Sequence, residues 1–460
     1  NKFRVTLRLG KVRQMPDHAI SSDPAVQAQL DRLTMLSPGK DVLGLTRIAA
    51  LLERLGNPHL NLPPVFHVSG TNGKGSTCAF LRGAIEAAGM TTHVYSSPHL
   101  VRFNERIRVA GKLIDDVSLS ALLSEVLDHA EGLEASFFEV TTAVAFCAFA
   151  RTPADACIVE VGLGGRLDAT NVLTQPVACG IASLGLDHEG FLLAAEDGVP
   201  DMPPLDRIAF EKAGIAKSGS PLLTQKYSAS MANTVATQAT LHNAPLHARG
   251  ESWDAAVYDG RLHYRDATGK LNLPLPRMIG AHQADNAALA IAMLRHQNAI
   301  HIPEAALAAA MEWTRWPARM QTLSAGPLTD QLPTGSTVWL DGGHNPDAGA
   351  AIAKTLEDSQ PVHVIIGMLM NKDALGFLTP FAHKIESLFA VPIAGHEHHD
   401  PKDLCDWAQN SFKIADARHA NSITDAIEQL AGRQVSANIL ICGSLYLAGE
   451  VLRLNDQSPD

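Results

Sequence analysis

Apolar and polar residues follow a pattern along the first two thirds of the chain that predicts strands separated by helices. The apolar run 65–68 leads into the glycine-rich segment Ser69–Gly75, and from Phe80 to Gly89 apolar residues recur at helical spacing. Further strands are predicted at 92–96, 157–161 and 177–184, and a further helix at 141–151. Because strands alternate with helices, the pattern favours a doubly wound, mostly parallel α/β sheet.

The segment 191–204 is acidic, contains prolines and has no clear period, so we interpret it as an extended loop. Residues 253–275 predict short strands with a turn near 266–269, and helical spacing returns at 281–295 and 304–313. These elements complete the predicted first domain.

A domain boundary is expected near Met320, because Pro317 and the stretch 326–335 are typical of a linker. Apolar strands are predicted beyond it at 337–340, 362–366, 388–391 and 438–442, with helical patterns between them. The sequence therefore predicts a P-loop-containing domain at 1–320 and a second, smaller Rossmann-like α/β domain at 321–460.

Composition narrows the class of protein. The chain has 460 residues, enough for about three domains of roughly 150 residues each, and 46% of them are hydrophobic, which is typical of a folded globular protein. The net charge is −11 without a dense basic block, so a nucleic-acid partner is not expected. No apolar run approaches the roughly 18 residues of a membrane span, and no signal for export stands out. Six scattered cysteines without a C-x-x-C pair indicate reduced thiols in a cytoplasmic protein.

The strongest local signal is the segment Ser69–Thr77, which reads Ser-Gly-Thr-Asn-Gly-Lys-Gly-Ser-Thr between a predicted strand and a predicted helix. Glycines let backbone N–H groups approach phosphate oxygens, the helix N-terminus favours anions, and Lys74 adds a positive charge. The glycine spacing differs from the standard phosphate-binding motif, so an ordinary glycine-rich turn is the alternative interpretation.

Polar residues lie at or just after the C-terminal ends of three predicted strands: Ser96 and Ser97, Glu160, and Asp187 with His188. Carboxyl ends of parallel strands meet at one edge of a sheet, where ligands bind. Hydroxyl, carboxylate and imidazole groups beside bound phosphates make a plausible Mg²⁺ site. Each residue alone is also an ordinary polar group at a strand end.

Three further segments remain open on residue chemistry alone. Residues 160–171 follow a strand with a flexible turn and are equally compatible with a capped connection to a helix. Residues 341–346, Asp-Gly-Gly-His-Asn-Pro, again join a strand to a helix and predict a second loop facing the site across a cleft. The cluster 396–400, His-Glu-His-His-Asp, lacks metalloprotease spacing, and we interpret it as a solvated loop.

Taken in order, these motifs resemble one family. The matching segments are 71–76, 96–100, 102–107, 160–171, 211–215, 282–287, 341–346 and 442–446. The chain resembles bacterial dihydrofolate synthase/folylpolyglutamate synthase, a Mur-ligase-like family of ATP-dependent amide ligases. The resemblance implies that the ATP γ-phosphate activates a carboxylate as an acyl phosphate, which the amino group of L-glutamate attacks. The implied substrates are dihydropteroate and reduced folates, with ATP and Mg²⁺ as cofactors.

The resemblance also implies roles for individual residues. It assigns ATP binding to Thr71, Asn72, Gly73, Lys74, Gly75, Ser76, Asn286, Arg319 and Asp341. It assigns Mg²⁺ binding to Ser97, Glu160 and His188, and to Lys212 once a carbamate converts its amine into a carboxylate; catalysis is assigned to Lys74, Glu160, His188 and Lys212. Pterin binding is assigned to Leu43, Ser136, Phe137, Phe138, Glu139, Leu167, Asp168 and Ala169.

Some positions depart from the family pattern. Glu189 follows His188 where the family has Thr, and the spacing from His188 to Lys212 is longer than usual. Ala318 precedes Arg319 where Gly is usual, and Asn371 stands in place of Asp. Another Mur-like ligase, a P-loop ATPase switch and a folate-binding regulator remain alternatives, although a binder needs neither Glu160 nor Lys212. We expect a monomer that binds small molecules and has no nucleic-acid or membrane partner.

Overall fold

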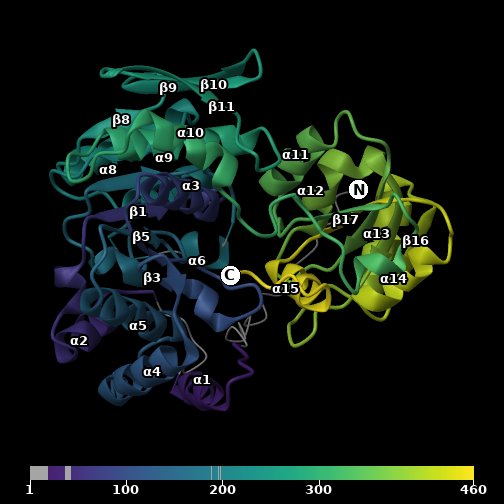
Figure 1. Cartoon of the computed structure of the whole chain (residues 1–460), viewed down its shortest axis with the longest axis horizontal. Helices are drawn as coiled ribbons and strands as arrows, with labels where there is room; N and C mark the ends of the chain where they lie inside the picture. The colour runs from purple at the N-terminus through teal and green to yellow at the C-terminus, as the bar shows by residue number, and fades with distance from the viewer. Residues whose placement is uncertain (1–18, 37–42, 188, 195, 197) are drawn as a thin grey trace.

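The computed structural model describes residues 19–36, 43–187, 189–194, 196 and 198–460. Its elements form two α/β units side by side, with a small antiparallel sheet above the first (Figure 1). The strands of the first sheet are, in spatial order, β4 (Lys112–Leu113), β3 (Ile107–Val109), β2 (Thr92–Tyr95), β5 (Ala156–Glu160), β1 (Val65–Ser69), β6 (Ala178–Ile181), β7 (Leu222–Thr224) and β8 (Leu246–Ala248). The pairs β2–β3 and β3–β4 are antiparallel and the other pairs are parallel, which confirms the predicted doubly wound α/β class.

Helices cover both faces of this sheet because its strands are apolar on both sides. Phe66, Ile158 and Ala178 are in register and face a core that includes residues of α3 (Lys74–Ala87), α9 (His282–Arg295) and α10 (Glu304–Trp313). The next residues along each strand face the other side, as strand alternation requires. That side is covered by α1 (Pro24–Leu36), α2 (Thr46–Arg54), α4 (Asp116–Ala130), α5 (Phe137–Arg151), α7 (Pro204–Ala213) and α8 (Ala229–Leu241).

A three-stranded antiparallel sheet lies over α9 and α10 at the top of Figure 1. Its strands are β9 (Trp253–Tyr258), β10 (Arg261–Asp266) and β11 (Gly269–Pro274). The turn between β10 and β11 lies where the sequence predicts it. Alternate residues such as Trp253, Leu262 and Leu273 are buried against the helices, so the sheet extends the core of the first unit.

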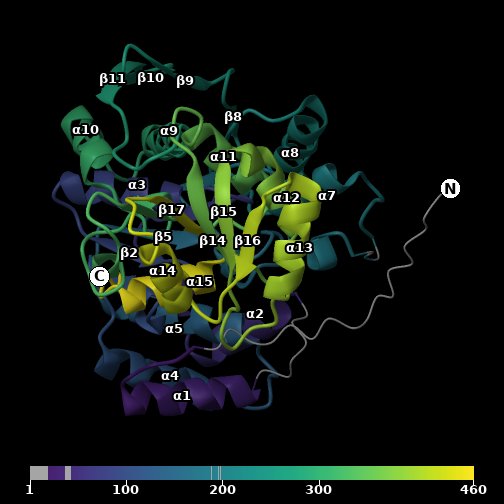
Figure 2. The same cartoon turned by 90° about the vertical axis from the view of Figure 1, so that its right-hand side faces the viewer.

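The second sheet faces the viewer in Figure 2. Its strands are, in spatial order, β12 (Gln321–Thr322), β13 (Thr337–Leu340), β17 (Asn438–Cys442), β14 (Val362–Ile366), β15 (Ile385–Ala390) and β16 (Asp416–His419). Only the short pair β12–β13 is antiparallel among these described strands. The surrounding helices are α11 (Pro346–Thr355), α12 (Ala374–Leu378), α13 (Pro401–Phe412), α14 (Ile423–Ala431) and α15 (Leu445–Leu454).

The structure corrects three sequence predictions. Residues 326–335 are not a linker, because Leu328 is buried in the second unit and its N–H donates to Asn455 Oδ1. The edge strand β16 was missed because its ends, Asp416 and His419, are polar. The segment 191–204 is not wholly a loop, since α6 (Glu189–Leu192) extends into its start and α7 begins at its end.

The six cysteines are all buried free thiols, which agrees with the sequence prediction. Across the described ranges, the helices are too short or too polar to cross a lipid bilayer.

Candidate active site

The loop between β1 and α3 needs glycine at two positions. Gly70 and Gly73 have φ angles of 146° and 88°, which side-chain-bearing residues rarely adopt. A Cβ on Gly70 would lie 2.8 Å from Ala182 Cβ, and one on Gly73 would overlap Asn286 Oδ1. The loop therefore lies close to its neighbours at the N-terminus of α3, where the helix dipole favours an anion.

This loop is anchored to the segment that follows β6. Thr71 N–H donates to Ser183 O at 2.7 Å, and its hydroxyl donates to Gly185 O at 2.9 Å. The Lys74 ammonium donates to Gly70 O at 2.9 Å and to Thr71 O at 3.2 Å. A mobile cation thus lies against the loop itself, within reach of any phosphate that the loop binds.

Glu160, the last residue of β5, is 4% exposed and accepts a hydrogen bond from Ser97 N–H at 3.3 Å. Burial raises the pKa of its carboxyl to about 6, against the opposing effects of Lys74, the Ser97 N–H, Arg319 and Arg106. The structure thus brings together Glu160, at the end of β5, and Ser97, which follows the neighbouring strand β2. A buried carboxylate that favours neutralisation is suited to a divalent cation.

Lys212 reaches the same loop from α7. Its side chain is buried, and Nζ donates to Gly70 O at 3.0 Å. Burial, reinforced by the charge of Lys74, lowers its pKa to about 7, while Asp187, Asp168 and Glu211 oppose the shift. An amine whose pKa is lowered this far is partly uncharged near neutral pH, so it can react as a nucleophile.

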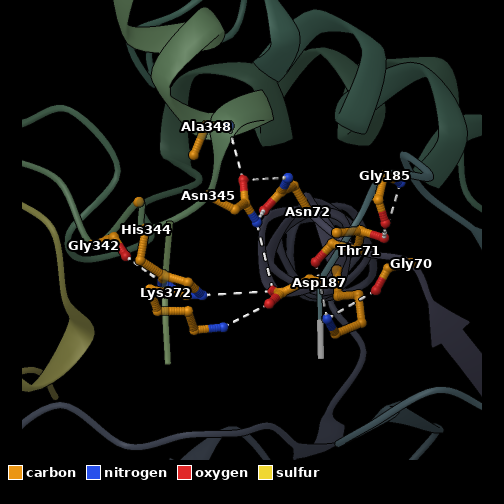
Figure 3. A network of polar contacts seen from close by, with 12 residues as sticks. Gly70, Thr71, Asn72, Gly185, Asp187, Gly342, His344, Asn345, Ala348 and Lys372 are labelled. Carbon is orange, nitrogen blue, oxygen red and sulfur yellow. Dashed lines mark hydrogen bonds and ion pairs between the residues drawn. The ribbon is translucent and has the colours of Figure 1, made fainter. Parts of the chain in front are cut away.

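A polar network joins the loop to the second unit (Figure 3). Asn72 and Asn345 exchange side-chain hydrogen bonds of 3.2 Å and 3.1 Å. Asp187 Oδ1 forms an ion pair with Lys372 Nζ at 2.5 Å, and Asp187 Oδ2 lies 3.6 Å from His344 Nε2. His188, the next residue, lies outside the described residues, so its predicted role as a metal ligand stays a prediction.

The other residues that are predicted to bind the nucleotide lie around this loop. The Asn286 amide on α9 donates to Gln283 Oε1 at 3.1 Å and lies against Gly73. Gly75 lies against the Trp316 indole, a contact that no motif in the sequence indicates. Asp341 accepts from the N–H groups of Met320 and Gly343 at 2.8 Å and 2.7 Å and so fixes the turn after β13.

Ala318 has a φ angle of 54°, in the left-handed region that favours glycine. A glycine, which the resemblance predicts before the arginine, would adopt this conformation without strain. Arg319 donates to Ala318 O at 2.9 Å, and its charge acts on Glu160.

A cavity of about 220 Å³ lies between the two units. Ser97, Glu160 and Arg319 line it, together with Trp316 from the connection and Leu445 from the second unit. The carboxylate and the arginine therefore face a space that is large enough for part of a small substrate.

The predicted pterin residues divide into two groups. Phe138, Leu43 and Leu167 are partly exposed, and the Phe138 ring stacks on Tyr95 with centroids 5.8 Å apart. Phe137, Glu139, Asp168 and Ala169 are buried, and Ser136 is partly exposed but is engaged in a helix cap. Ser136 and Glu139 form a capping box at the start of α5, Glu139 pairs with Arg47 at 3.0 Å, Phe137 packs on Phe103, and Asp168 caps the turn Ala169–Val172.

Within the described part of the chain, no cluster of three or more His, Cys, Asp or Glu side chains could hold a metal ion. A divalent cation beside Glu160 would therefore need other donors, such as the Ser97 hydroxyl, phosphate oxygens or a modified Lys212. The donor chemistry at this position fits such an ion.

Two α/β units that meet at a glycine-rich loop, with a buried carboxylate and a buried lysine of lowered pKa beside it, define a Mur-ligase-like ATP-dependent ligase. The chain is 33% identical over 421 residues to dihydrofolate synthase/folylpolyglutamate synthase of Escherichia coli (strain K12), covering 90% of this chain and 92% of that protein. It is 32% identical to the Bacillus subtilis (strain 168) protein of the same name, covering 89% and 94%.

Solved structures of this family have a similar fold. "E.coli FolC in complex with DHPP and ADP" has a TM-score of 0.81 at 31% identity and covers 94% of this chain and 97% of that chain. A bifunctional folylpolyglutamate synthase/dihydrofolate synthase with Mn, AMPPNP and L-glutamate bound has a TM-score of 0.79 at 28% identity, covering 94% and 99%. The family described as "Dihydrofolate synthetase, C-terminal domain" matches residues 327–454. The chain belongs to the dihydrofolate synthase/folylpolyglutamate synthase family, whose members are ATP-dependent ligases.

Proposed function

We propose that this protein joins L-glutamate to dihydropteroate and to reduced folates, with ATP as the energy source and Mg²⁺ as the cation. The observation that carries the proposal is the meeting of three groups at one loop. Lys74 and Lys212 both donate to Gly70 O, and Glu160 lies beside Ser97 at the end of the adjacent strand. The solved relatives with ADP, AMPPNP, Mn and L-glutamate support the same substrates.

Nucleotide binding belongs to the loop and its surroundings. Residues 71–76 would hold the phosphates, and Lys74 would turn toward them from the carbonyls of Gly70 and Thr71. Asn286, Arg319 and Asp341 complete this part of the site, Asn286 through its contact with Gly73. The Arg319 charge would help to offset the repulsion between ATP and the substrate carboxylate.

Ser97, Glu160, His188 and a carbamate on Lys212 would hold Mg²⁺, which supplies positive charge for the phosphate oxygens. The Lys212 amine is suited to add CO₂ because it is partly uncharged near pH 7. Lys74, Glu160, His188 and Lys212 are therefore the residues on which the rate depends. The substrate carboxylate attacks the γ-phosphorus and ADP leaves; the glutamate amine then attacks the acyl phosphate and releases phosphate.

The pterin would bind against Leu43, Phe138 and Leu167, which are partly exposed. Ser136, Phe137, Glu139, Asp168 and Ala169 would hold this wall from behind, through the capping contacts described above. The flat ring of Phe138 is suited to stack on a heterocycle. In this arrangement residues 1–320 bind ATP and pterin, and residues 321–460 form the second ligase domain of a cytoplasmic monomer.

Product analysis tests the proposal. Purified protein is incubated with ATP, Mg²⁺ and L-glutamate plus either dihydropteroate or tetrahydrofolate, and products are identified by mass spectrometry. We expect a mass increase of one or more glutamyl residues and ADP release that requires both co-substrates. ATP hydrolysis without either co-substrate would favour a switch, and ligation of another amino acid would favour a different Mur-like ligase.

A further inference from the structure

Behind Lys212 lies a cluster of four charged side chains, which we call the Arg166 cluster: Arg166, Glu196, Arg207 and Glu211. Arg166 holds Glu211 with two hydrogen bonds, Nε to Oε2 at 3.2 Å and Nη2 to Oε1 at 3.0 Å. Arg207 reaches the same carboxylate at 2.8 Å. Glu196 pairs with both arginines on the outer side of the cluster.

Burial differs across the cluster. The Glu211 side chain is 4% exposed, that of Arg166 22% and that of Glu196 37%. A buried carboxylate is costly unless it is paired, so Glu211 requires its guanidinium partners. Since Arg207 already supplies one, the charge of Glu211 stays compensated when Arg166 is removed. The fold therefore does not depend on Arg166 alone.

The same residues join two backbone segments. Arg166 N–H donates to Glu211 O at 2.8 Å. Gly165 approaches so closely that a Cβ there would lie 2.8 Å from Glu211 O, and a Cβ on Gly214 would lie 2.6 Å from Arg166 Cα. The loop that follows Glu160 is thereby fixed against the C-terminal end of α7.

This contact determines where Lys212 points. Glu211 and Lys212 are consecutive residues of α7, so their side chains leave the helix about 100° apart. With Glu211 held by the loop after β5, Lys212 is directed to Gly70 O. The two proposed metal ligands, Glu160 and Lys212, are thus linked by one short path through Arg166.

We propose that Arg166 is a positioning residue: its two-pronged hold on Glu211 fixes the end of α7 so that the Lys212 amine stays against the phosphate loop. This inference rests on the proposed function, because it concerns the use of Lys212 as a carbamate. Loss of the Arg166 side chain would leave α7 folded and its backbone contacts in place but would remove the hold on the Glu211 carboxylate, so that Lys212 would be held less firmly against Gly70 O. Partners that orient metal ligands in this way typically contribute about 10- to 100-fold to metal affinity.

The test compares Arg166→Gln, Arg166→Lys and Glu196→Gln. Glu196→Gln is the matched control, because it removes an outer partner of Arg166 without touching Glu211. Mn²⁺ binding is measured by electron paramagnetic resonance, the Lys212 carbamate by ¹³C NMR in ¹³C-bicarbonate, and the melting temperature by calorimetry. We expect Arg166→Gln to weaken Mn²⁺ binding about tenfold or more and to reduce the carbamate signal. Arg166→Lys should recover part of both, and Glu196→Gln should match the wild type.

Equal Mn²⁺ affinity and carbamate signal in Arg166→Gln and wild type would overturn the inference. A loss of Mn²⁺ binding that merely follows a large fall in melting temperature, with no recovery in Arg166→Lys, would also overturn it, because Arg166 would then be structural. Failure of the proposed function is a separate result: the wild-type protein would form no glutamylated product with either pterin substrate.

Discussion

The two buried ionisable residues beside the phosphate loop are shifted in opposite directions. Burial raises the pKa of Glu160 to about 6 and lowers that of Lys212 to about 7. Both shifts favour the uncharged form, as expected where little water can solvate an ion. In the empty site, the surroundings of both residues therefore disfavour the charged form. Shifted pKa values of this kind are common at functional sites.

Glu160→Gln should stabilise the metal-free protein and inactivate it. The Glu160 pKa rises from an ordinary 4.5 to about 6, so the folded state binds more protons in this window and stability falls as pH rises through it. A shift of this size corresponds to about 2 kcal/mol. In urea denaturation the variant should exceed wild type by about 2 kcal/mol at pH 7 and match it below pH 4.5. A variant less stable than wild type at pH 7 would contradict this account.

Lys212→Arg should abolish ligation, because a guanidinium can neither form a carbamate nor lose its charge. In the wild type, ligation should fall when CO₂ and bicarbonate are removed and recover when they are restored. The effect should increase below pH 7, since the amine, with a pKa of about 7, becomes protonated there. Initial rates in degassed and bicarbonate-containing buffer measure it. Equal rates in both buffers would exclude a role for the carbamate.

At the scale of single elements, α3 depends on the glycine that precedes it. Gly73→Ala would place a methyl group on Asn286 Oδ1 and force alanine to φ 88°. We expect ADP affinity, measured by calorimetry, to fall by about tenfold or more, since the strain alone costs about 1–2 kcal/mol. Gly89→Ala is the matched control: Gly89 ends the same helix with φ 81° and has nothing within 4 Å. If both variants lose affinity equally, the close approach to Asn286 is not the cause.

Two residues at the start of α5 allow substrate contact and helix stability to be tested separately. Phe138→Ala should raise the KM for dihydropteroate by about tenfold, because one aromatic stack contributes about 0.5–1.5 kcal/mol beyond burial. Ser136→Ala should instead lower the free energy of unfolding by about 1 kcal/mol, since Ser136 caps the helix by accepting from Glu139 N–H. Its KM should stay near that of wild type. Steady-state kinetics and urea denaturation of both variants distinguish these roles, and the reverse assignment would contradict the proposed pterin wall.

The sequence predicts those features that depend on short stretches of chain. The phosphate loop is recognisable because glycines, a lysine and a strand–helix junction lie within nine residues. Strand ends converge by the general geometry of parallel sheets, so Ser97 and Glu160 could be expected to meet. The start of α5 and the strand β16 are harder to predict from the sequence. The start of α5 depends on a side-chain cap at Ser136, and β16 is a strand with polar ends that pairs with β15 at the edge of the sheet.

At the scale of the whole molecule, one ion pair spans the two units. Lys372 and Asp187 are each 11% exposed and 2.5 Å apart. Removing one partner of such a pair leaves an uncompensated charge and costs about 3–5 kcal/mol. Lys372→Met should therefore favour a more open arrangement, seen as a larger radius of gyration in small-angle X-ray scattering of the ligand-free protein. Lys384→Met is the control, because Lys384 donates only to carbonyls of its own unit, Glu357 O and Ser359 O.

An unchanged scattering profile in Lys372→Met would show that the ion pair does not hold the units together. The sequence predicts that the loop 341–346 faces the site, and Asn345 of this loop does contact Asn72. No local pattern could have predicted which residues pair between the units. Asn72 and Asn345 are 273 positions apart, and Asp187 and Lys372 are 185 apart. Such pairings depend on how two separately folded sheets pack against each other, which periodicity and motif spacing do not encode.

Asn345 accepts two hydrogen bonds through its side-chain oxygen, one from its own helix and one from the phosphate loop. Its Oδ1 caps α11 by accepting from Ala348 N–H at 2.9 Å, and it also accepts from the Asn72 amide. If Asn72 turned toward a bound nucleotide, α11 would keep its cap, because Asn345 Oδ1 would still accept from Ala348 N–H. The hydrogen bonds between the two amides could then break without unwinding the first turn of the helix.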